Sequence, residues 1–505
     1  MSIENTIFIG VGVYLVTMLI IGVLASKRAN TTAGFMVAGR GMPIWICSAT
    51  IVATWFGGGT MMGAAGAAYE DGLIGVIADP FGGALALFVV GFFFVRIFRR
   101  LRLLTFIEFF ETRYGTTAAM IAAIASIASG IGWAGALLVA FGFVFETMTG
   151  IPLEIGILGG AAVVFIYTIA GGMWAVAITD FVQILVIAFG LVLLLVVVLI
   201  DAGGWGNIGP HLPAETFRMT PSESSAWAWL DYLRAWLIFG LADVTAQSLL
   251  QRAFSAKDEQ TAQNSFYLAG IGHLSLGMIP VTLGIIASVT MPGLTSPETV
   301  VPQLALAHLH PVAIALFVGA LLSAIMSSAD STLLASATIF TVNILPRFKP
   351  QASDRFQLLA TRIAIPIFGC VAVYIALEVK VVYDLIMDAN SVTLVCVVIP
   401  FIVGIWWKRA NRTGALASMA TGSITWLSLM LFAPDVAGDL LGMFVALITI
   451  LIVTPLTQAF DPPNPLRDGE GNEVELKNRL GTLPLFRRVS DPDRDGATGN
   501  GLVSS

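Results

Sequence analysis

The chain has 505 residues, of which 57% are hydrophobic and 11% are charged, with a mean hydropathy of +0.88 and a net charge of −6. Soluble domains carry roughly a quarter charged residues, so this composition excludes a soluble protein and places the chain in a lipid bilayer. The acidic residues are spread over loops and a C-terminal tail, so the net charge indicates no particular partner, and we expect no nucleic acid among the partners.

Apolar segments long enough to cross a bilayer core of about 30 Å follow one another along most of the chain. They predict an all-α membrane protein with a transmembrane domain over residues 1–460 and a disordered, cytoplasmic tail over 461–505. The expected spans number thirteen: 5–26, 43–68, 75–98, 118–147, 151–171, 175–201, 227–251, 265–292, 306–343, 357–378, 384–406, 412–434 and 438–460.

Lysine and arginine fall mostly in alternate loops, and loops rich in these residues stay in the cytoplasm. The bias predicts a multi-pass protein of the cell membrane with its N-terminus outside and its C-terminus inside. The opposite loops hold only Arg218 and Lys380. The cytoplasmic set includes Lys27, Arg28, Arg40, Arg96, Arg99, Arg100, Arg102, Arg113, Arg252, Lys257, Arg347 and Arg412.

Two spans contain glycine near their middles. The second carries Gly57, Gly58 and Gly59 in a row, and each costs a helix about 1 kcal/mol relative to alanine, so we expect the helix to break there. The seventh places Asp243 shortly after Gly240, which is a weaker signal for a break. Because these spans lie five apart, they predict two five-helix inverted repeats with a binding site at the membrane midplane.

The ninth span has a polar face. Ala324, Ser327, Ser328 and Ser331 differ by three or four positions and therefore lie on one side of a helix. Serine hydroxyls in membrane helices often serve packing between helices, but the neighbouring Asp330 is costly in a membrane and is typical of an ion path or a buried pair. Hydroxyl oxygens here, with backbone carbonyls freed by the break in the second span, predict a sodium site.

Asp180 is a second intramembrane acid, near one end of the sixth span. One interpretation is an acid that reaches water or caps the helix. The other is a second cation site that Asp180 shares with Asp330 and Ser331.

Trp55 and Trp133 lie near the middles of the second and fourth spans, far from the interfaces where tryptophan is most common. Their side chains either pack between helices or form an aromatic surface that binds a solute by a cation–π interaction.

Three separated blocks resemble the solute:sodium symporter family, and the branch of the high-affinity choline transporters is the most similar. The blocks are TWFGGGTMMGAA (54–65), GGMWAVAITDFVQ (171–183) and SAIMSSADSTLLASATIF (323–340). The resemblance extends over most of residues 40 to 410. It implies a LeuT-type core of ten helices, about residues 43–406, that works by alternating access and uses Na⁺.

The resemblance also implies ligands. The family's main sodium site corresponds here to the carbonyls of Ala53, Phe56 and Ala324 and the hydroxyls of Ser327 and Ser328. A second sodium site of some members corresponds to Asp180, Ser327 and Ser331, with Asp330 where a serine stands elsewhere.

The solute site that the resemblance implies surrounds Trp55 and the glycines Gly57, Gly58 and Gly59. The aromatic cage of the choline transporters matches at Trp55 and Trp133, but its two other positions correspond to Gly83 and Ala246. Asp243 offers a carboxylate to an ammonium group, so we expect a small amine or a zwitterion.

The leading hypothesis is a sodium-coupled symporter that imports a small organic solute, not an enzyme, because no nucleophile with a base and no metal ligands are expected to meet in the bilayer. Two alternatives stay open: a proton-coupled symporter that uses Asp180 and Asp330, and a membrane sensor of transporter shape.

Overall fold

The computed structural model describes residues 3–26, 32–434, 436–474 and 480. These residues form helices and connecting loops and contain no β-strand, only two isolated bridges. The predicted basic residues Lys27 and Arg28 and most of the predicted tail lie outside the described residues.

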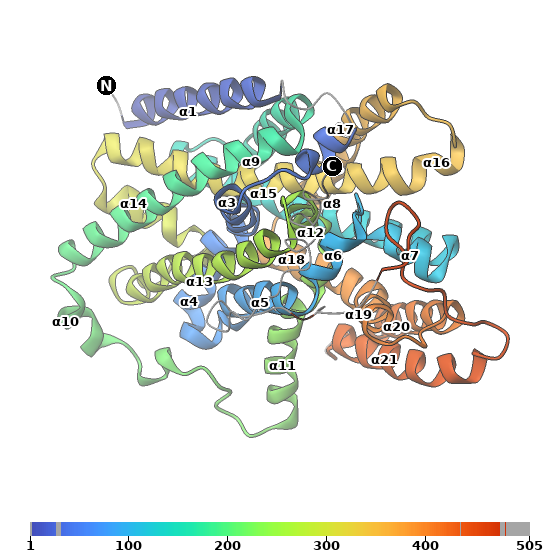
Figure 1. Ribbon diagram of the computed structural model, residues 1–505. Coiled ribbons are helices and arrows are strands. Elements are labelled where there is room, and N and C mark those ends of the chain that lie inside the picture. The colour runs from blue at the N-terminus through green and yellow to red at the C-terminus, as the bar shows by residue number, and fades with distance from the viewer. Residues whose placement is uncertain (1–2, 27–31, 435, 475–479, 481–505) are drawn as a thin grey trace, which may run out of the picture.

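The long elements follow the predicted spans in order (Figure 1). Eight of the described helices are long and apolar enough to cross a membrane, or up to eleven if each bent pair counts as one span, so thirteen stays a prediction. The main helices are α1 (Ile3–Ser26), α3 (Ile44–Trp55), α4 (Ala64–Asp71), α5 (Gly83–Phe93), α6 (Val95–Leu101), α8 (Thr116–Thr149), α9 (Leu153–Asp201), α11 (Ala226–Gly240), α12 (Gln247–Ser255), α13 (Glu259–Thr290), α15 (Pro311–Ile339), α17 (Asp354–Val379), α18 (Val382–Thr393), α19 (Ile399–Trp406), α20 (Arg412–Phe432) and α21 (Gly438–Thr457).

Shorter elements join these helices. Those near the site or the tail are four short helical turns and the short helix between α6 and α8. They are η2 (Gly59–Gly63), η4 (Ile77–Gly82), α7 (Ile107–Tyr114), η7 (Ala242–Thr245) and η10 (Leu394–Val398).

Both predicted helix breaks are present. The segments Ile44–Trp55 and Gly59–Ile74 are bent by 59° relative to each other, and Ala226–Thr245 and Gln247–Ser255 by 49°. The spans at 151–171 and 175–201 are a single element, α9, interrupted at Gly172, whose φ of 59° is in the left-handed region. A break in the first helix of each five-helix half agrees with the predicted inverted repeat.

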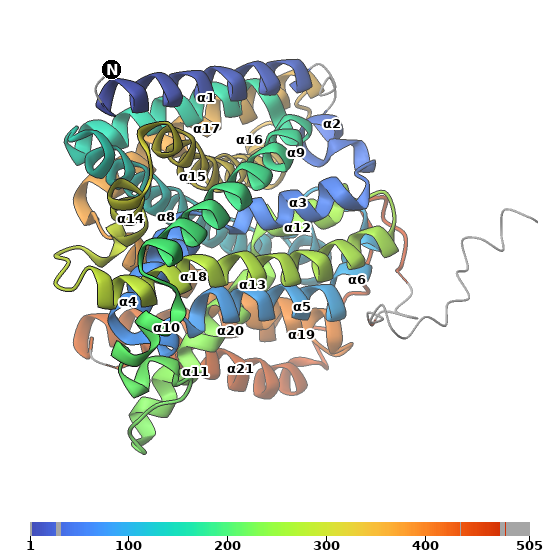
Figure 2. The same ribbon diagram turned by 90° about the vertical axis from the view of Figure 1, so that its left-hand side faces the viewer.

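The broken helix α3 lies in the interior of the bundle in both ribbon views, with α1 along one edge and α20 and α21 along the opposite edge (Figures 1 and 2). The central helix α15 packs against α8, α9 and α3. All of its residues from Phe317 to Ser331 are buried. The break in α3 and the polar face of α15 therefore meet in the protein interior.

The described start of the tail is attached to the helical part. Asn464 accepts a hydrogen bond on its carbonyl from Arg113 and donates one from its amide to the Arg113 carbonyl. The amide of Gly469 donates to the carbonyl of Leu101, 2.8 Å away. The described start of the tail is thus bonded to α7 and to the end of α6.

Candidate functional site

The helix α3 ends because its backbone changes direction at Phe56, where φ is −77° and ψ is 68°. In a continuous helix the amide of Gly57 would donate to the carbonyl of Ala53. It donates instead to the carbonyl of Trp55, 2.9 Å away, and helical bonding resumes with Met61 and Gly57. The carbonyl of Ala53 is thereby released from the helix.

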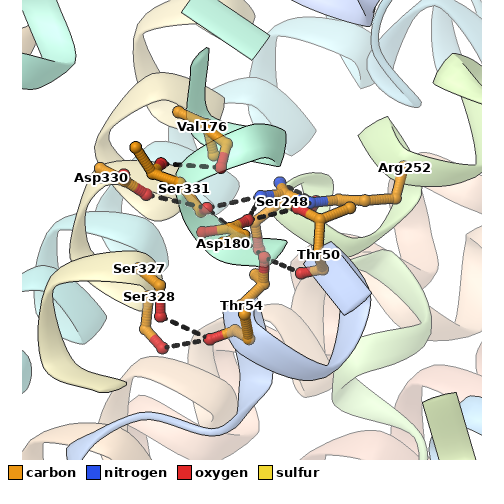
Figure 3. A network of polar contacts seen from close by, with 12 residues as sticks. Thr50, Thr54, Val176, Asp180, Ser248, Arg252, Ser327, Ser328, Asp330 and Ser331 are labelled. Atoms are coloured by element: carbon orange, nitrogen blue, oxygen red, sulfur yellow. Dashed lines mark hydrogen bonds and ion pairs between the residues drawn. The ribbon is translucent and has the colours of Figure 1, made fainter. Parts of the chain in front are cut away.

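Two hydroxyls of α15 take up this released carbonyl. Ser327 donates to the oxygen of Ala53 over 2.8 Å and Ser328 over 3.3 Å. Both hydroxyls also lie near the carbonyl of Ala324, at 3.1 and 3.2 Å. Four buried oxygen atoms from the two helices therefore form one cluster, seen at the lower left of Figure 3, where Ser327 and Ser328 face the end of α3.

Phe56 is the fifth residue expected at this cluster. It is fully buried and is the first non-helical residue after α3. The described hydrogen bonds of the two serine hydroxyls go to Ala53 and Ala324 rather than to Phe56. The Phe56 carbonyl, three positions after that of Ala53, is therefore the one expected ligand that is not hydrogen-bonded to either serine hydroxyl.

The three glycines allow the two helices to approach. A Cβ atom on Gly57 would lie 2.6 Å from Oγ of Ser328, and one on Gly58 would lie 2.6 Å from Cβ of Ala140. Gly59 faces Ile386 in the same way, at 2.9 Å. None of the three has a positive φ, so close packing explains the glycines better than an unusual backbone conformation.

A second polar network lies one helical turn further along α15 (Figure 3). Asp180 of α9 accepts a short hydrogen bond from Thr50. Ser331 donates to Asp330 over 3.0 Å. Asp180, Asp330 and Ser331 are all fully buried, so the interpretation of Asp180 as a solvated or capping acid is wrong.

Sequence reasoning missed the centre of this network, which is Arg252 of α12. Its guanidinium donates to Ser331 over 2.5 Å and forms an ion pair with Asp180 at 3.4 Å. Counting Arg252 among the cytoplasmic loop charges was wrong, because α12 is the second half of a broken span and extends to Ser255, with Arg252 fully buried. That a second sodium ion binds at Asp180, Asp330 and Ser331 stays a prediction.

Two cavities adjoin the break in α3, and Trp55 and Trp133 line both of them. The first, here called the α12-side cavity, is lined by α8, η7, α12 and α15. The second, the α4-side cavity, is lined by α4, α11 and α18. Gly59 lines the α4-side cavity, whereas Gly57 and Gly58 pack against α15 and α8.

Asp243 lies on η7, the turn that interrupts the seventh span, and lines the α12-side cavity. It is 3% exposed, and its Oδ2 atom has no hydrogen-bond partner in the part of the chain described. Asn390 contributes a hydrogen bond to the same carboxylate and accepts one from the indole of Trp133, 2.7 Å away. The break in α11–α12 thus presents a carboxylate oxygen beside a tryptophan.

Asp79 lines the α4-side cavity and belongs to a further pair that the sequence did not reveal. His273 of α13 lies 2.8 Å from Oδ1 of Asp79, and Thr60 donates to Oδ2 of Asp79 over 2.5 Å. The His273 ring also packs on Trp55, with 5.6 Å between ring centroids. Both oxygens of Asp79 are therefore satisfied by the protein, in contrast to Asp243.

Known proteins resemble this chain over most of its length. The sequence profile of the sodium:solute symporter family matches residues 35–422. The chain is 28% identical over 438 residues to a high affinity choline transporter of Homo sapiens, covering 82% of this chain and 75% of that protein. It is 26% identical over 490 residues to the osmoregulated proline transporter OpuE of Bacillus subtilis (strain 168), covering 91% and 96%.

Solved structures give the same fold. A Na⁺-coupled sialic acid symporter in a substrate-bound outward-open state matches with a TM-score of 0.77 at 21% identity, over 92% of this chain and 99% of that one. A nucleobase-cation-symport-1 family transporter matches with a TM-score of 0.57 at 14% identity, over 86% and 96%. The predicted LeuT-type fold is confirmed, and the relatives are transporters rather than enzymes, as expected.

Proposed function

Because the chain belongs to the sodium:solute symporter family and is a multi-pass, sodium-coupled transporter of a small organic solute, we propose that the solute is a small amine or zwitterion. We further propose that sodium binds between α3 and α15 and the solute beside Trp55 and Asp243.

The oxygen cluster supports the sodium site. Hydroxyl and carbonyl oxygens are neutral, hard ligands, and those of Ala53, Ala324, Ser327 and Ser328 already lie within one cluster. Phe56 would supply a fifth oxygen by a small rotation of its peptide group at the helix end. Each sodium ion that enters along an inward gradient gains about 2.3 kcal/mol per 100 mV of membrane potential, which is the energy source for uptake.

The short distance along the chain between the proposed sodium ligand and the proposed solute-binding residue would couple sodium binding to solute binding. Ala53 and Trp55 are two residues apart at the end of α3, so a sodium ion that fixes the Ala53 carbonyl also fixes the position of the Trp55 ring. A solute that stacks on Trp55 then binds best when sodium is present. This is positive linkage between two ligands through one short segment.

The buried oxygen of Asp243 is the observation that favours an amine with at least one N–H. A buried carboxylate oxygen without a partner is costly, and a charged N–H donor satisfies it with a strong hydrogen bond. The ammonium group of choline has no N–H and is bound best by a complete aromatic cage. Here two positions of that cage are Gly83 and Ala246.

Charge supports the proposed orientation, with the N-terminus outside and the C-terminus in the cytoplasm. Basic residues gather at one end of the bundle: Arg99 of α6 donates to the carbonyls of Ala256 and Lys257 in the loop before α13, and the neighbouring Arg100 pairs with Glu259. A concentration of arginine and lysine at one face is typical of the cytoplasmic side.

The test is a methylation series on one scaffold: ethanolamine, N-methylethanolamine, N,N-dimethylethanolamine and choline, with proline and glucose as a zwitterion and a neutral solute. Stabilisation of the purified chain against heating is measured in NaCl and in KCl. We expect sodium-dependent stabilisation by a member that carries an N–H, and sodium-driven uptake of the same compound into liposomes.

The variant Asp243→Asn should abolish the preference for N–H donors. Strongest stabilisation by choline would contradict the role given to Asp243, and stabilisation by glucose alone would contradict a cationic solute. Stabilisation that is equal in KCl and NaCl would contradict the coupling between Trp55 and Ala53.

A further inference from the structure

The network around Arg252 joins four helices at a point that the main sodium site does not use. Arg252 lies on α12, Asp180 on α9, Asp330 and Ser331 on α15, and Thr50 on α3. All five side chains are at most 1% exposed. A fully buried guanidinium needs both a counter-charge and hydrogen-bond acceptors, and this one has both.

The hydrogen bonds within the network have a definite direction. Arg252 donates to the hydroxyl oxygen of Ser331, and the same hydroxyl donates to Oδ1 of Asp330. Thr54 also donates to the Ser331 oxygen, at 3.4 Å. The oxygen of Ser331 therefore already accepts hydrogen bonds, one of them from a positive charge.

Asp180 is engaged in the same way. Its Oδ2 atom accepts from Thr50 and pairs with the Arg252 guanidinium at 3.4 Å, while a second nitrogen of that guanidinium donates to the carbonyl of Ser248 over 2.6 Å. Both Asp180 and Asp330 act electrostatically on Arg252. Two oxygens of the expected second sodium site, Oδ2 of Asp180 and the hydroxyl of Ser331, thus contact a cation that belongs to the chain.

The sum of charges supports one mobile cation rather than two. When both carboxylates are ionised, their two negative charges and the one positive charge of the guanidinium sum to a net charge of −1. Ser327 precedes Ser331 by one helical turn, about 6 Å, so a sodium ion at the main site brings the local charge to zero. A second sodium ion would leave a net positive charge in a low-dielectric region and would lie against the guanidinium, which is unfavourable.

We propose that Arg252 is a built-in cation that occupies the place of a second sodium ion, so that each transport cycle carries one sodium ion, bound at the main site. This inference rests on the proposed main site between α3 and α15. It gives Arg252 a role in setting the ion stoichiometry in addition to linking α12 with α9 and α15.

The test is a count of sodium ions on the purified full-length chain, by equilibrium dialysis with ²²Na⁺, which requires no knowledge of the solute. We expect one sodium ion per wild-type chain and one in Arg252→Lys, which keeps the charge. Removing the charge in Arg252→Gln leaves Asp180, Asp330, Thr50 and Ser331 to bind a second ion, so we expect two, with the second lost again when Asp180→Asn is added.

Two sodium ions on the wild-type chain, with one lost in Asp180→Asn alone, would overturn the role of Arg252 and leave the main site intact. No bound sodium on the wild-type chain would instead overturn the main site, and with it the charge balance proposed here. An unchanged count of one in folded Arg252→Gln would also contradict the proposal. If Arg252→Gln does not fold, two sodium ions on the wild-type chain, with one lost in Asp180→Asn, still overturn the proposal.

Discussion

The hydroxyl of Ser327 lies 2.8 Å from the carbonyl oxygen of Ala53, although 274 positions separate the two residues in the chain. The contact exists because the backbone leaves the helical conformation at Phe56. The Ala53 carbonyl then has no helical partner and accepts hydrogen bonds from α15. It is the point at which the two five-helix halves of the fold share one group of oxygens.

Ser327→Ala and Ser328→Ala should each weaken sodium binding and leave the protein folded. Each removes one oxygen from the cluster, and an interaction with a charged group is worth about 1.5–3 kcal/mol. We expect the sodium concentration for half-maximal stabilisation to rise by roughly ten- to a hundredfold. Sodium titration of the melting temperature measures this.

Ser323→Ala is the matched control for these two variants. Ser323 is a buried serine of the same helix, one turn before Ser327. Its hydroxyl lies 2.6 Å from the hydroxyl of Tyr14 and 2.7 Å from the carbonyl of Gly319, neither of which belongs to the sodium cluster. Its sodium titration should match the wild type. Equal effects of all three substitutions would indicate that the serines serve packing only.

Gly57→Ala should weaken sodium binding without removing any ligand. The added Cβ would lie 2.6 Å from Oγ and 3.0 Å from Cβ of Ser328, so Ser328 or the α3 break must move. Gly159→Ala in α9 is the control, because nothing lies within 4 Å of its added Cβ. The same sodium titration compares the two, and an unchanged midpoint in Gly57→Ala would show that the close approach of α3 and α15 is unimportant for the ion.

Trp55→Ala should weaken solute binding more than sodium binding. Trp55 lines both cavities but contributes no oxygen to the sodium cluster. Loss of a cation–π contact of about 0.5–2 kcal/mol predicts a two- to thirtyfold rise in the half-saturating solute concentration. Trp45→Ala, at the 70% exposed start of the same helix, should change neither titration. Parallel losses for solute and sodium in Trp55→Ala would mean that Trp55 acts through packing of α3.

The sequence was sufficient for the parts of the site that are local. Three consecutive glycines predict the helix break after Trp55. The spacing of the serines is enough to place Ser327 and Ser328 on one face of α15. These signals are local because helix propensity and the 3.6-residue period act over a few residues.

The parts that sequence reasoning missed are pairs formed across the fold. Arg252 meets Asp180 over 72 positions and His273 meets Asp79 over 194. From the sequence, Arg252 could not be distinguished from a charged residue in a cytoplasmic loop, because no sequence signal shows where a broken span ends. A charged residue near the end of a broken span has two interpretations, and only the position of its partner separates them.

Two acids near Trp55, the partly buried Asp79 and the buried Asp243, should differ in how their substitution or the loss of their partner changes stability. His273→Leu leaves the Asp79 carboxylate without its partner at 2.8 Å, which costs about 1.5–3 kcal/mol and should lower the melting temperature. Asp243→Asn removes a charge whose Oδ2 has no described partner, so the solute-free protein should be as stable as the wild type or more so, while binding of N–H solutes is lost. Functional residues often destabilise the unliganded fold in this way.

Melting curves of both variants, with and without solute, measure the contrast. A large loss of stability in solute-free Asp243→Asn would show that Asp243 is a structural residue satisfied within the protein, and the solute would then need another counter-charge.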